Sequence, residues 1–531
     1  MAPPTLSLLS DLTPPSLERA WLSAPHPTLP IVATCSSDKT VRVYSLTNFK
    51  LLSTITGGHK RSVRTAAWKP HVQGESVLAT GSFDATVGVW RRWDSYGRTE
   101  GGSASAGADD ASASNPDAGD NDEEDEEWRF AVLLDGHDSE VKSVSWSASG
   151  MLLATCARDK SIWIWEDLDD GDNNFETVAV MQEHGGDVKC VAWHPAEECL
   201  ASGGYDDTIR VWREDLDDWG QVACIKAHSG TVWFLDWESV DNVPLTSSSS
   251  SADEGAELVN QWREQHALSG PRLLSCSDDR TVRIWRRLPK ENGSPGLNSS
   301  ASTGIPSIIR PTGSDETWEE DAVLPHAHEL AVYAVAWSRR TGIVASVGAD
   351  GRIVLYDERI VNAPASDADA METESTKKPS VQTEWSILAV VDGAHGIYEI
   401  NHAAWAKRAD RGSTEGQEEE VLVTTADDGS VKVSVPTLER ALFADSGGWT
   451  AEDGPGRDHE RSTASTTNPS SYGHLPRFLR LIFYNSSRRE QKRVLTATGT
   501  IVYMPNKWSK VKGTILKYAN KKLARPSVAV H

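Results

Sequence analysis

Four residue types recur along this chain at a spacing that could assemble a catalytic site. A serine or threonine is followed four residues later by an aspartate and six residues after that by a tryptophan, as in Thr155, Asp159 and Trp165. A histidine, here His137, lies upstream. Histidine, aspartate and a hydroxyl group are the components of a nucleophilic catalytic site. However, nucleophilic catalysis needs one assembled set, and this chain has up to seven copies, so we expect a repeated structural role and no catalytic residues.

The copies share one spacing and differ mainly at the last position. Four copies end in tryptophan: Thr80–Asp84–Trp90, Thr155–Asp159–Trp165, Ser202–Asp206–Trp212 and Ser275–Asp279–Trp285. Two copies end in tyrosine, Thr34–Asp38–Tyr44 and Ser346–Asp350–Tyr356, and a seventh, Thr424–Asp428–Ser434, lacks the aromatic residue. Six copies follow a histidine: His59, His137, His184, His228, His328 and His395.

We expect these residues to form buried hydrogen-bond networks that fix a tight turn to its strands. Such a network stabilises a fold when it is complete and is costly when one member is lost. In the third unit its members are His137, Thr155, Asp159 and Trp165, and in the fourth unit His184, Ser202, Asp206 and Trp212.

The elements that position these residues are short strands. Each unit contains four apolar or alternating segments separated by turns, and 47 residues separate Trp165 from Trp212. A period of about 40–45 residues with this pattern is typical of the WD-repeat blade. We therefore predict an all-β fold, a seven-bladed WD-repeat β-propeller, in which the N-terminal strand 5–12 supplies the outer strand of blade seven and closes the ring.

Composition excludes several classes of protein. The chain has 531 residues, 53 Lys+Arg against 77 Asp+Glu and a formal net charge of −24, which argues against a protein that coats nucleic acid. No apolar run reaches the roughly 18–20 residues of a membrane span, and the N-terminus does not resemble a secretory signal. We expect no membrane partner and a location in the reducing cytosol or nucleus.

The six cysteines form no C-x-x-C pair, so we expect no metal site and no cofactor. Cys35, Cys156 and Cys276 each follow the Ser or Thr of a different unit. Equivalent positions in separate blades do not converge, so these cysteines are expected to be small core residues.

The propeller is predicted to span 1–435, with disordered insertions at about 94–127, 239–269, 290–316 and 358–383. These ranges are rich in Ser, Pro, Gly and acidic residues, and the segment ADDASASNPDAGDNDEEDEE has ten acidic residues and no Lys or Arg. Such segments cannot bury enough apolar surface to fold on their own.

The C-terminal segment 436–531 departs from the repeat pattern. Residues 471–531 contain 13 Lys+Arg and one acidic residue. One interpretation is a basic arm for nucleic acid or acidic lipid. The other, which we favour, is that this basic tail is not part of the propeller and results from a misread exon boundary. The favoured interpretation rests on Ser434, where the expected Trp is lost just as the composition changes.

Two long segments carry a specific resemblance to a known family. The runs HDSEVKSVSWSASGMLLATCARDKSIWIWE and HGGDVKCVAWHPAEECLASGGYDDTIRVWREDLDDW, in units three and four, resemble the WD-repeat family of the cytosolic iron–sulfur protein assembly machinery. GHKRSVRTAAW, GSFDATVGVW, CSDDRTVRIW and HGIYEINHAAW with VTTADDGSVKV also look like that family. The resemblance covers about residues 5–433 without the insertions.

This resemblance implies a non-catalytic scaffold in a targeting complex that delivers iron–sulfur clusters to cytosolic and nuclear apoproteins. The implied partners are a MIP18-type adaptor, a large HEAT-repeat subunit, an iron-only-hydrogenase-like cluster carrier and the iron–sulfur apoprotein clients. The family is also understood to recognise client tails that end in an aromatic residue.

The register of the repeats places a set of candidate partner-binding residues around one end of the ring. One subset lies four residues before the end of each innermost strand, and the other directly before each turn aspartate. Among these positions we select Trp21, Arg64, Phe83, Lys142, Arg158, Lys189, Tyr205, Trp233 and Tyr333. This composition, Trp, Tyr and Arg with lysines, is that of interaction hot spots.

The predicted surface suits an acidic peptide with an aromatic side chain or a free terminal carboxylate. Arg158 is placed to bind a carboxylate through two hydrogen bonds, which lysine cannot imitate. The alternative is a WD-repeat substrate receptor of a ubiquitin ligase, or a histone or chromatin-binding scaffold. A histone reader should offer an acidic or aromatic cage, whereas this ring has four basic members.

Overall fold

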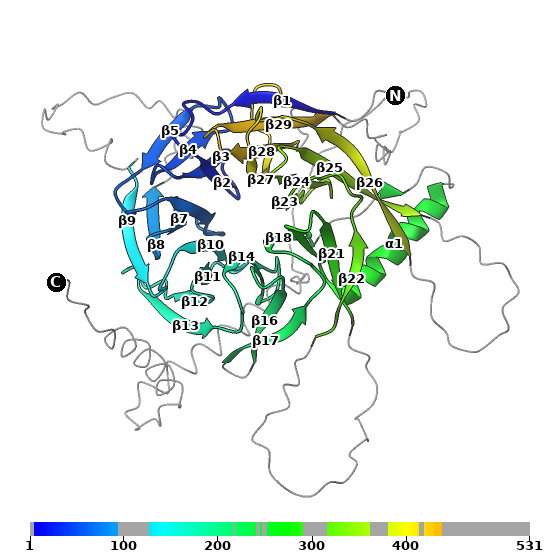
Figure 1. Ribbon diagram of the computed structural model, residues 1–531, viewed down its shortest axis with the longest axis horizontal. Helices are drawn as coiled ribbons and strands as arrows, with labels where there is room; N and C mark the ends of the chain where they lie inside the picture. Colours follow the sequence, from blue (N-terminus) through cyan, green and yellow to red (C-terminus); the bar gives the residue numbers. More distant parts are fainter. Residues whose placement is uncertain are drawn as a thin grey trace, which may run out of the picture. The chain divides into compact units, whose positions relative to one another are not determined.

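The computed structural model describes residues 5–93, 127–215, 218–240, 245–246, 252–289, 316–361, 381–413 and 419–437. Within them, antiparallel strands form seven sheets arranged around a central axis (Figure 1). Six sheets have four strands and one has five. The predicted seven-bladed WD-repeat β-propeller is confirmed.

The blades follow the order of the chain, and the strands of each are given from the innermost outward. Blade one contains β2 (Ala20–Pro25), β3 (Ile31–Ser36), β4 (Val41–Ser45) and β5 (Leu51–Ile55). Blade two contains β6 (Val63–Trp68), β7 (Glu75–Ser82), β8 (Thr86–Trp93) and β9 (Arg129–Asp135). Blade three contains β10 (Val141–Trp146), β11 (Leu152–Ala157), β12 (Ile162–Asp167) and β13 (Phe175–Met181). Blade four contains β14 (Val188–Trp193), β15 (Cys199–Gly204), β16 (Ile209–Asp215) and β17 (Asp218–Ile225).

The remaining blades carry additional features. Blade five contains β18 (Val232–Trp237), β20 (Leu273–Ser277), β21 (Val282–Arg287) and β22 (Trp318–Val323). Blade six contains β23 (Val332–Trp337), β24 (Val344–Gly348), β25 (Ile353–Val361) and β26 (Gln382–Val391), and β19 (Leu245–Thr246) pairs in parallel with β25. Blade seven contains β27 (Ile400–Lys407), β28 (Glu420–Ala426), β29 (Val431–Thr437) and the N-terminal β1 (Thr5–Asp11).

The core lies between neighbouring blades. In blade three, every residue of β11 is buried, because other blades cover both faces of the sheet. Ile162 and Ile164 of that blade pack with Val188, Val191 and Trp193 of blade four. The outer strand β9 of blade two is largely exposed, although its sequence RFAVLLD is mostly apolar.

Strand β1 closes the ring by pairing antiparallel with β29. Thr5 lies opposite Thr437 and Asp11 opposite Lys432, and the two strands lie side by side in Figure 1. Leu12, only 1% exposed, packs with Val431 and Val433. The N-terminal strand therefore joins the last repeat, two segments that lie at opposite ends of the repeat region in sequence.

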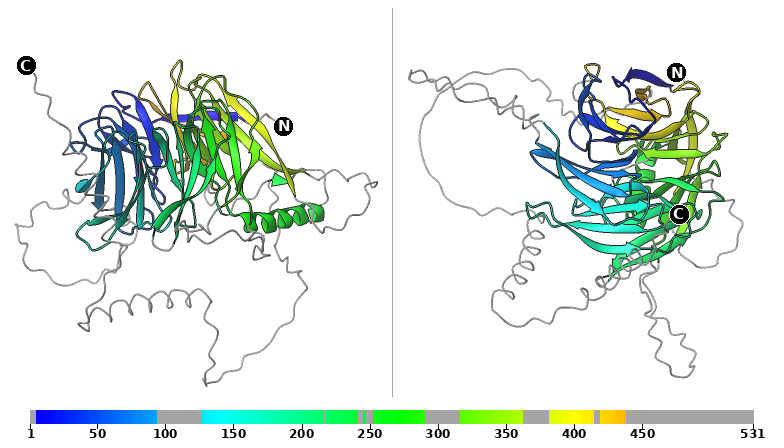
Figure 2. Two further views of the ribbon diagram at one scale, coloured as in Figure 1. Left: turned by 60° about the horizontal axis from the view of Figure 1, so that its bottom comes forward. Right: turned by 60° about the vertical axis from the view of Figure 1, so that its left-hand side comes forward.

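The expectation of a disordered insertion at 239–269 is wrong for part of that range. Residues Ala252–Ser269 form the helix α1, and Figure 2 shows it along one end of the green strands of the propeller. Trp262 is 4% exposed, and the ring of His266, one turn later, stacks on it at 4.6 Å. Burial of a tryptophan and a good helix-forming composition outweigh the polar character of the insertion.

The other predicted insertions are bounded more narrowly than expected. β25 continues to Val361, where Glu358 and Ile360 are buried, and β26 begins at Gln382, so strands occupy both ends of 358–383. Glu316 pairs with Arg213 at 2.7 Å, although it falls at the end of 290–316. Residues 94–126, 290–315, 362–380 and 438–531 lie outside the described residues.

Candidate functional site

The His–Thr–Asp–Trp set of blade three is assembled around a buried hydroxyl group. Nε2 of His137 lies 2.9 Å from Oγ1 of Thr155, and Nδ1 lies 3.1 Å from a carboxylate oxygen of Asp159. The indole nitrogen of Trp165 donates to the same threonine oxygen at 3.0 Å. The turn itself is closed by the Asp159 carboxylate, which accepts the backbone N–H of Ser161 at 2.9 Å.

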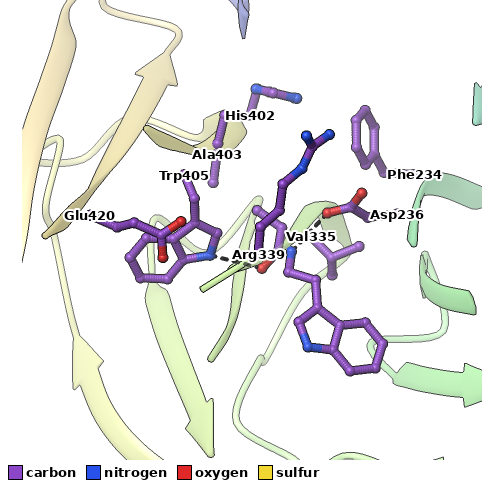
Figure 3. A pocket seen from close by; sticks show the side chains of 11 residues that line it. Phe234, Asp236, Val335, Arg339, His402, Ala403, Trp405 and Glu420 are labelled. Atoms are coloured by element: carbon purple, nitrogen blue, oxygen red, sulfur yellow. Dashed lines mark hydrogen bonds between the residues drawn. The ribbon is translucent and has the colours of Figure 1, made fainter. Parts of the chain in front are cut away.

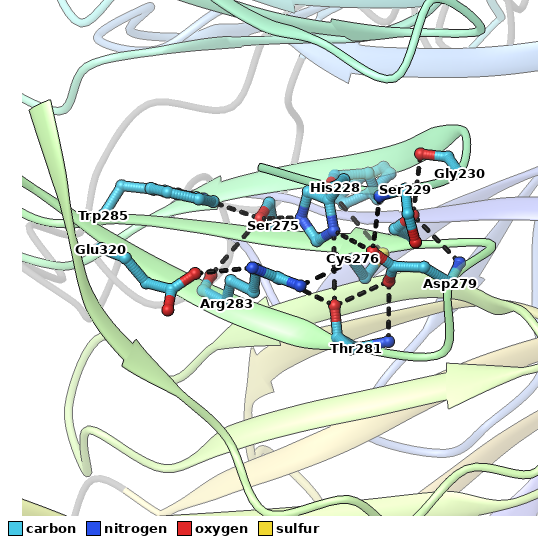
Figure 4. A network of polar contacts seen from close by, with 12 residues as sticks. His228, Ser229, Gly230, Ser275, Cys276, Asp279, Thr281, Arg283, Trp285 and Glu320 are labelled. Atoms are coloured by element: carbon cyan, nitrogen blue, oxygen red, sulfur yellow. Dashed lines mark hydrogen bonds and ion pairs between the residues drawn. The ribbon is translucent and has the colours of Figure 1, made fainter. Parts of the chain in front are cut away.

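The same contacts recur in other blades. In blade four, His184 contacts Ser202 at 2.7 Å and Asp206 at 3.0 Å, and Trp212 donates to Ser202 at 2.8 Å. Figure 4 shows the corresponding network of blade five around His228 and Asp279, which lie 2.9 Å apart. All eight residues selected for these networks in blades three and four are therefore brought together within their own blades.

Electrostatics hold the turn carboxylates ionised. Burial alone would raise the pKa of Asp206, but hydrogen bonds and charge from His184, together with the backbone N–H of Gly185, bring it well below its usual value. The pKa of Asp159 is lowered in the same way, chiefly by His137 against the effect of burial. Each hydroxyl group is thus saturated by partners, and each network lies in a separate blade, so the arrangement serves the turns.

The predicted partner-binding residues lie at the end of the propeller that carries these aspartate turns, which we call the top face. The guanidinium of Arg64 lies 4.7 Å from the ring centre of Trp21, and Trp21 in turn packs 5.9 Å from Phe83. The ammonium of Lys142 lies 4.4 Å from the Phe83 ring. These four residues come from three consecutive blades, one to three, and form one continuous series of contacts.

A second series continues around the central axis from blade four to blade six. The ammonium of Lys189 lies 4.4 Å from the ring of Tyr205 and 5.0 Å from that of Trp233. Trp233 packs edge-on against Tyr333 at 5.2 Å. Alternating cations and aromatic faces stabilise one another, and each such contact contributes about 0.5–2 kcal/mol.

Arg158 connects the two series through acidic neighbours that the sequence analysis missed. Its guanidinium lies 3.4 Å from Glu140, which also accepts a hydrogen bond from Lys142 at 3.0 Å. It lies 3.9 Å from Asp187, which is 3.8 Å from Lys189. All nine predicted residues, which we call the top ring, are therefore linked, and the side chain of Arg158 remains 59% exposed.

Two further arginines also join this surface without having been predicted. The guanidinium of Arg19 lies 4.7 Å from the Trp21 ring, and Arg61 lies 5.9 Å from that of Phe83. The acidic residues Glu140 and Asp187 each directly precede an innermost strand. That shared position was the one sequence signal that could have found them.

Positive charge on the top ring is only partly compensated. Burial, together with the neighbouring charge of Lys142 and against the opposing effect of Asp187, lowers the pKa of Lys189 to about 8. Burial similarly lowers the pKa of Arg64 to about 10. Repulsion between Lys142 and Lys189 is the second cause of the shift at Lys189, after burial.

Two buried donors in the top ring have no acceptor. The indole nitrogens of Trp21 and Trp233 are inaccessible to solvent and have no hydrogen-bond partner among the described residues. An unsatisfied buried donor costs about 1–3 kcal/mol. The buried indole nitrogens of Trp146, Trp219 and Trp385 also lack a partner among the described residues, so this feature does not by itself distinguish the top ring.

The cysteines do not converge on one another. Cys35, Cys156 and Cys276 lie fully buried in three different blades, where burial raises the pKa of each thiol. Among the described residues, no group of three or more His, Cys, Asp or Glu side chains has the arrangement of a metal site. No helix in the described part of the chain is long and apolar enough to cross a membrane.

A cavity of about 230 Å³ lies between blades five, six and seven, near the ends of their innermost strands that face away from the top face (Figure 3). Figure 3 shows the guanidinium of Arg339 between Phe234, Asp236 and His402. The Asp236 carboxylate already accepts two backbone N–H groups, from Trp237 at 2.9 Å and Trp337 at 2.7 Å. Since Asp236 joins blade five to blade six, we assign the polar lining of this cavity to the structure of the ring.

Comparison with known proteins agrees with the repeat pattern. The family model "WD domain, G-beta repeat" matches residues 22–45, 49–91, 128–166, 175–213, 265–286 and 321–357. A protein of Penicillium rubens described as "Probable cytosolic iron-sulfur protein assembly protein 1" is 72% identical over 450 residues, which cover 81% of this chain and 98% of that protein. Proteins with the same description from Aspergillus terreus and Aspergillus flavus are 74% and 71% identical, over 81% of this chain and 97% of each relative.

Proposed function

This chain belongs to the WD-repeat family of cytosolic iron-sulfur protein assembly protein 1, and from that premise we propose that it is a non-catalytic scaffold of the machinery that delivers iron–sulfur clusters to apoproteins. The proposed partners are a MIP18-type adaptor, a large HEAT-repeat subunit and an iron-only-hydrogenase-like cluster carrier, and the proposed clients are cytosolic and nuclear apoproteins. The cluster is then the cargo of the complex. We propose a cytoplasmic location with access to the nucleus.

The top ring is the proposed binding site for client tails. The observation that carries this proposal is the linked series of cations and aromatic rings from Arg64 to Tyr333 on a chain whose net charge is −24. Aromatic rings can contact an aromatic side chain, and the cations can bind a carboxylate. Because Arg158 is the most exposed cation of the series, its forked guanidinium is placed to take the terminal carboxylate, in competition with Glu140 and Asp187.

The short turns of the top face support this assignment. Every break in the described part of the propeller falls between the first and second or between the third and fourth strands of a blade. Those connections all lie at the end opposite the top face. The top ring is therefore framed by connections that the structure describes in full, the longest of which have eight residues, and this favours a preformed binding surface.

Affinity purification with quantitative mass spectrometry tests the proposed function. We expect the unsubstituted protein to recover the three proposed subunits and client apoproteins, and Arg158→Glu to recover fewer clients. Arg411→Glu is the matched control, since Arg411 is an exposed arginine in the connection between β27 and β28 at the other end of the propeller. Recovery of cullin adaptors in place of the assembly subunits would instead favour a ubiquitin-ligase receptor and would contradict the proposal.

A further inference from the structure

The charge of the top face differs between its two halves, on either side of the central axis. Blades two to four present Arg64, Lys142, Arg158 and Lys189. On blades five to seven the residue before the turn aspartate is acidic at Asp278 and Asp427. Glu399 directly precedes the innermost strand β27, as Glu140 and Asp187 precede β10 and β14, but those two pair with Lys142, Arg158 and Lys189. The carboxylates of blades five to seven affect Tyr333. Burial, the charge of Glu399 and a hydrogen bond to it, and the charges of Asp278 and Asp427 raise the pKa of Tyr333 to about 12.

Two of the carboxylates on the acidic side remain available. Asp427 pairs with Arg19 and accepts a hydrogen bond from Asn401 at 2.8 Å. The structure gives no ion pair for Asp278 or Glu399 within the described residues. Asp278 is exposed on its turn, and Glu399 is half-buried beside Tyr333. A cation on a bound ligand could therefore pair with either residue.

The acidic side also carries exposed apolar side chains. Ile397 is 95% exposed, Leu330 is 53% exposed and Tyr398 is 46% exposed. All three lie in the short turns that lead from the histidine of blade six or seven into its innermost strand. The same turns of blades two to four carry the charged residues Arg61, Glu140 and Asp187. Exposed apolar residues beside aromatic rings at one end of a fold are typical of an interaction surface.

We propose that the top face binds a client tail in one direction only, and that blades five to seven select the residues just upstream of the terminus. The terminal carboxylate and aromatic side chain occupy blades three and four, and the preceding chain crosses Trp233 and Tyr333. An upstream basic side chain pairs with Glu399 or Asp278, and an apolar one contacts Ile397 and Leu330. The reverse direction would bring the carboxylate against Glu399 and Asp278, where like charges repel. Glu140 and Asp187 on blades three and four repel it less, because Lys142, Arg158 and Lys189 offset their charge.

This inference rests on the proposed function and adds a sequence preference to it. Titration calorimetry with a peptide series tests it, in which every peptide ends in the same aromatic residue with a free carboxylate. One set carries lysine at successive upstream positions, and the other carries glutamate at the same positions. We expect the best lysine peptide to bind about five- to tenfold more tightly than its glutamate counterpart, with a preference that falls as salt is added.

Substitutions on the top face test which residues cause the preference for an upstream lysine or apolar side chain. Glu399→Gln keeps a hydrogen-bond acceptor for Tyr333 and should remove most of the preference for lysine, whereas Glu384→Gln, at an exposed position on the outer strand β26, should keep it. Ile397→Ser should weaken binding of peptides with an apolar upstream residue. Unchanged melting temperatures would show that each variant is folded.

Two outcomes would overturn the inference. One leaves the proposed client site intact, and the other contradicts it as well. Equal affinities for the lysine and glutamate peptides, with binding retained, would remove the upstream selection alone. A failure of every peptide to bind the unsubstituted protein would remove the inference together with the client site of the proposed function.

Discussion

Lys189 is the last cation of the top ring before the aromatic pair Trp233 and Tyr333. Its ammonium contacts Tyr205 and Trp233, and only 11% of its side chain is exposed. Burial and the charge of Lys142 lower its pKa to about 8, compared with the usual value of 10.5. The folded protein therefore binds fewer protons at this site than the unfolded chain as the pH rises through that interval, and a bound anion should restore the proton.

This shift predicts how client binding depends on pH. The affinity for a peptide with a free terminal carboxylate should fall several-fold between about pH 7 and about pH 9, because Lys189 loses its charge in that range. Arginine does not titrate there, so Lys189→Arg should flatten the profile. Titration of both proteins across this range measures the effect. The same decline in Lys189→Arg would assign the pH dependence to another group.

The members of the top ring could be predicted from the sequence, but their charge balance could not. Positions such as Lys142 and Arg158 follow from the register of the repeat, because each blade places the same position at the same height. The pairing of Arg158 with Asp187 joins blade three to blade four, and no spacing within one repeat reveals it. The burial that shifts Lys189 likewise depends on side chains from a neighbouring blade, including Trp233.

At the scale of the element, each aspartate turn is a unit in which backbone and side chain depend on each other. The residue after the aspartate has a positive φ, 69° at Lys160 and 76° at Gly429. The carboxylate holds that conformation by accepting the N–H of the following residue, Ser161 in blade three and Ser430 in blade seven. Blade seven has the weaker version, since His395 lies 3.6 Å from Asp428, whose side chain is 23% exposed.

Replacement of these aspartates should therefore have unequal effects on stability. Asp159→Ala removes the acceptor of the turn N–H groups of Asp138 and Ser161 and leaves Nδ1 of His137 with the Ser161 hydroxyl as its one remaining contact. It should lower the free energy of unfolding by ~1–3 kcal/mol. Asp428→Ala should cost less, because solvent already reaches that carboxylate. Chemical denaturation of both variants measures the difference. An unchanged stability for Asp159→Ala, or equal losses for both, would contradict the role given to the network.

Helix α1 shows where composition misleads. The range 239–269 contains a run of serines and acidic residues, yet its second half ends beside a buried ion cluster. Arg272, 1% exposed, pairs with Glu238 at 2.8 Å and with Glu358 at 2.6 Å, and His266 of α1 contacts Glu238 at 2.7 Å. Buried charges of this kind are stable only when all of them are paired. The helix is therefore stabilised by contacts with residues that lie far away in the sequence, such as Glu238.

At the scale of the molecule, the question is whether the C-terminal segment takes part in closing the ring. About a fifth of this chain lies outside the match to each relative, whereas 97–98% of each relative lies inside it. The ring itself is closed by β1 and β29, which ends at Thr437. The predicted boundary at residue 435 is two residues too early, because Pro436 and Thr437 belong to β29 and pair with Leu6 and Thr5. We therefore propose that the propeller needs no residue beyond β29, and that residues 438–531 contribute no blade to it.

Two truncations test this division. Removal of residues 438–531 should leave the melting temperature and the recovery of partners unchanged. Removal of residues 1–12 should lower the melting temperature, because it deletes β1 and the buried Leu12. A lower melting temperature after the C-terminal truncation would contradict the proposal. Loss of RNA or DNA binding with a steep salt dependence would instead identify the segment as a functional basic arm.

The most direct test of the account is a titration of the top ring with one peptide in two forms. The peptide ends in an aromatic residue and carries either a free carboxylate or an amide at its terminus. We expect the free acid to bind and the amide to bind weakly. Arg158→Glu should cost at least ~2 kcal/mol, a factor of about 30 in affinity, and the control Arg411→Glu should leave the affinity unchanged. Equal binding of acid and amide, or equal affinities for Arg158→Glu and the unsubstituted protein, would show that the top ring is not the carboxylate site.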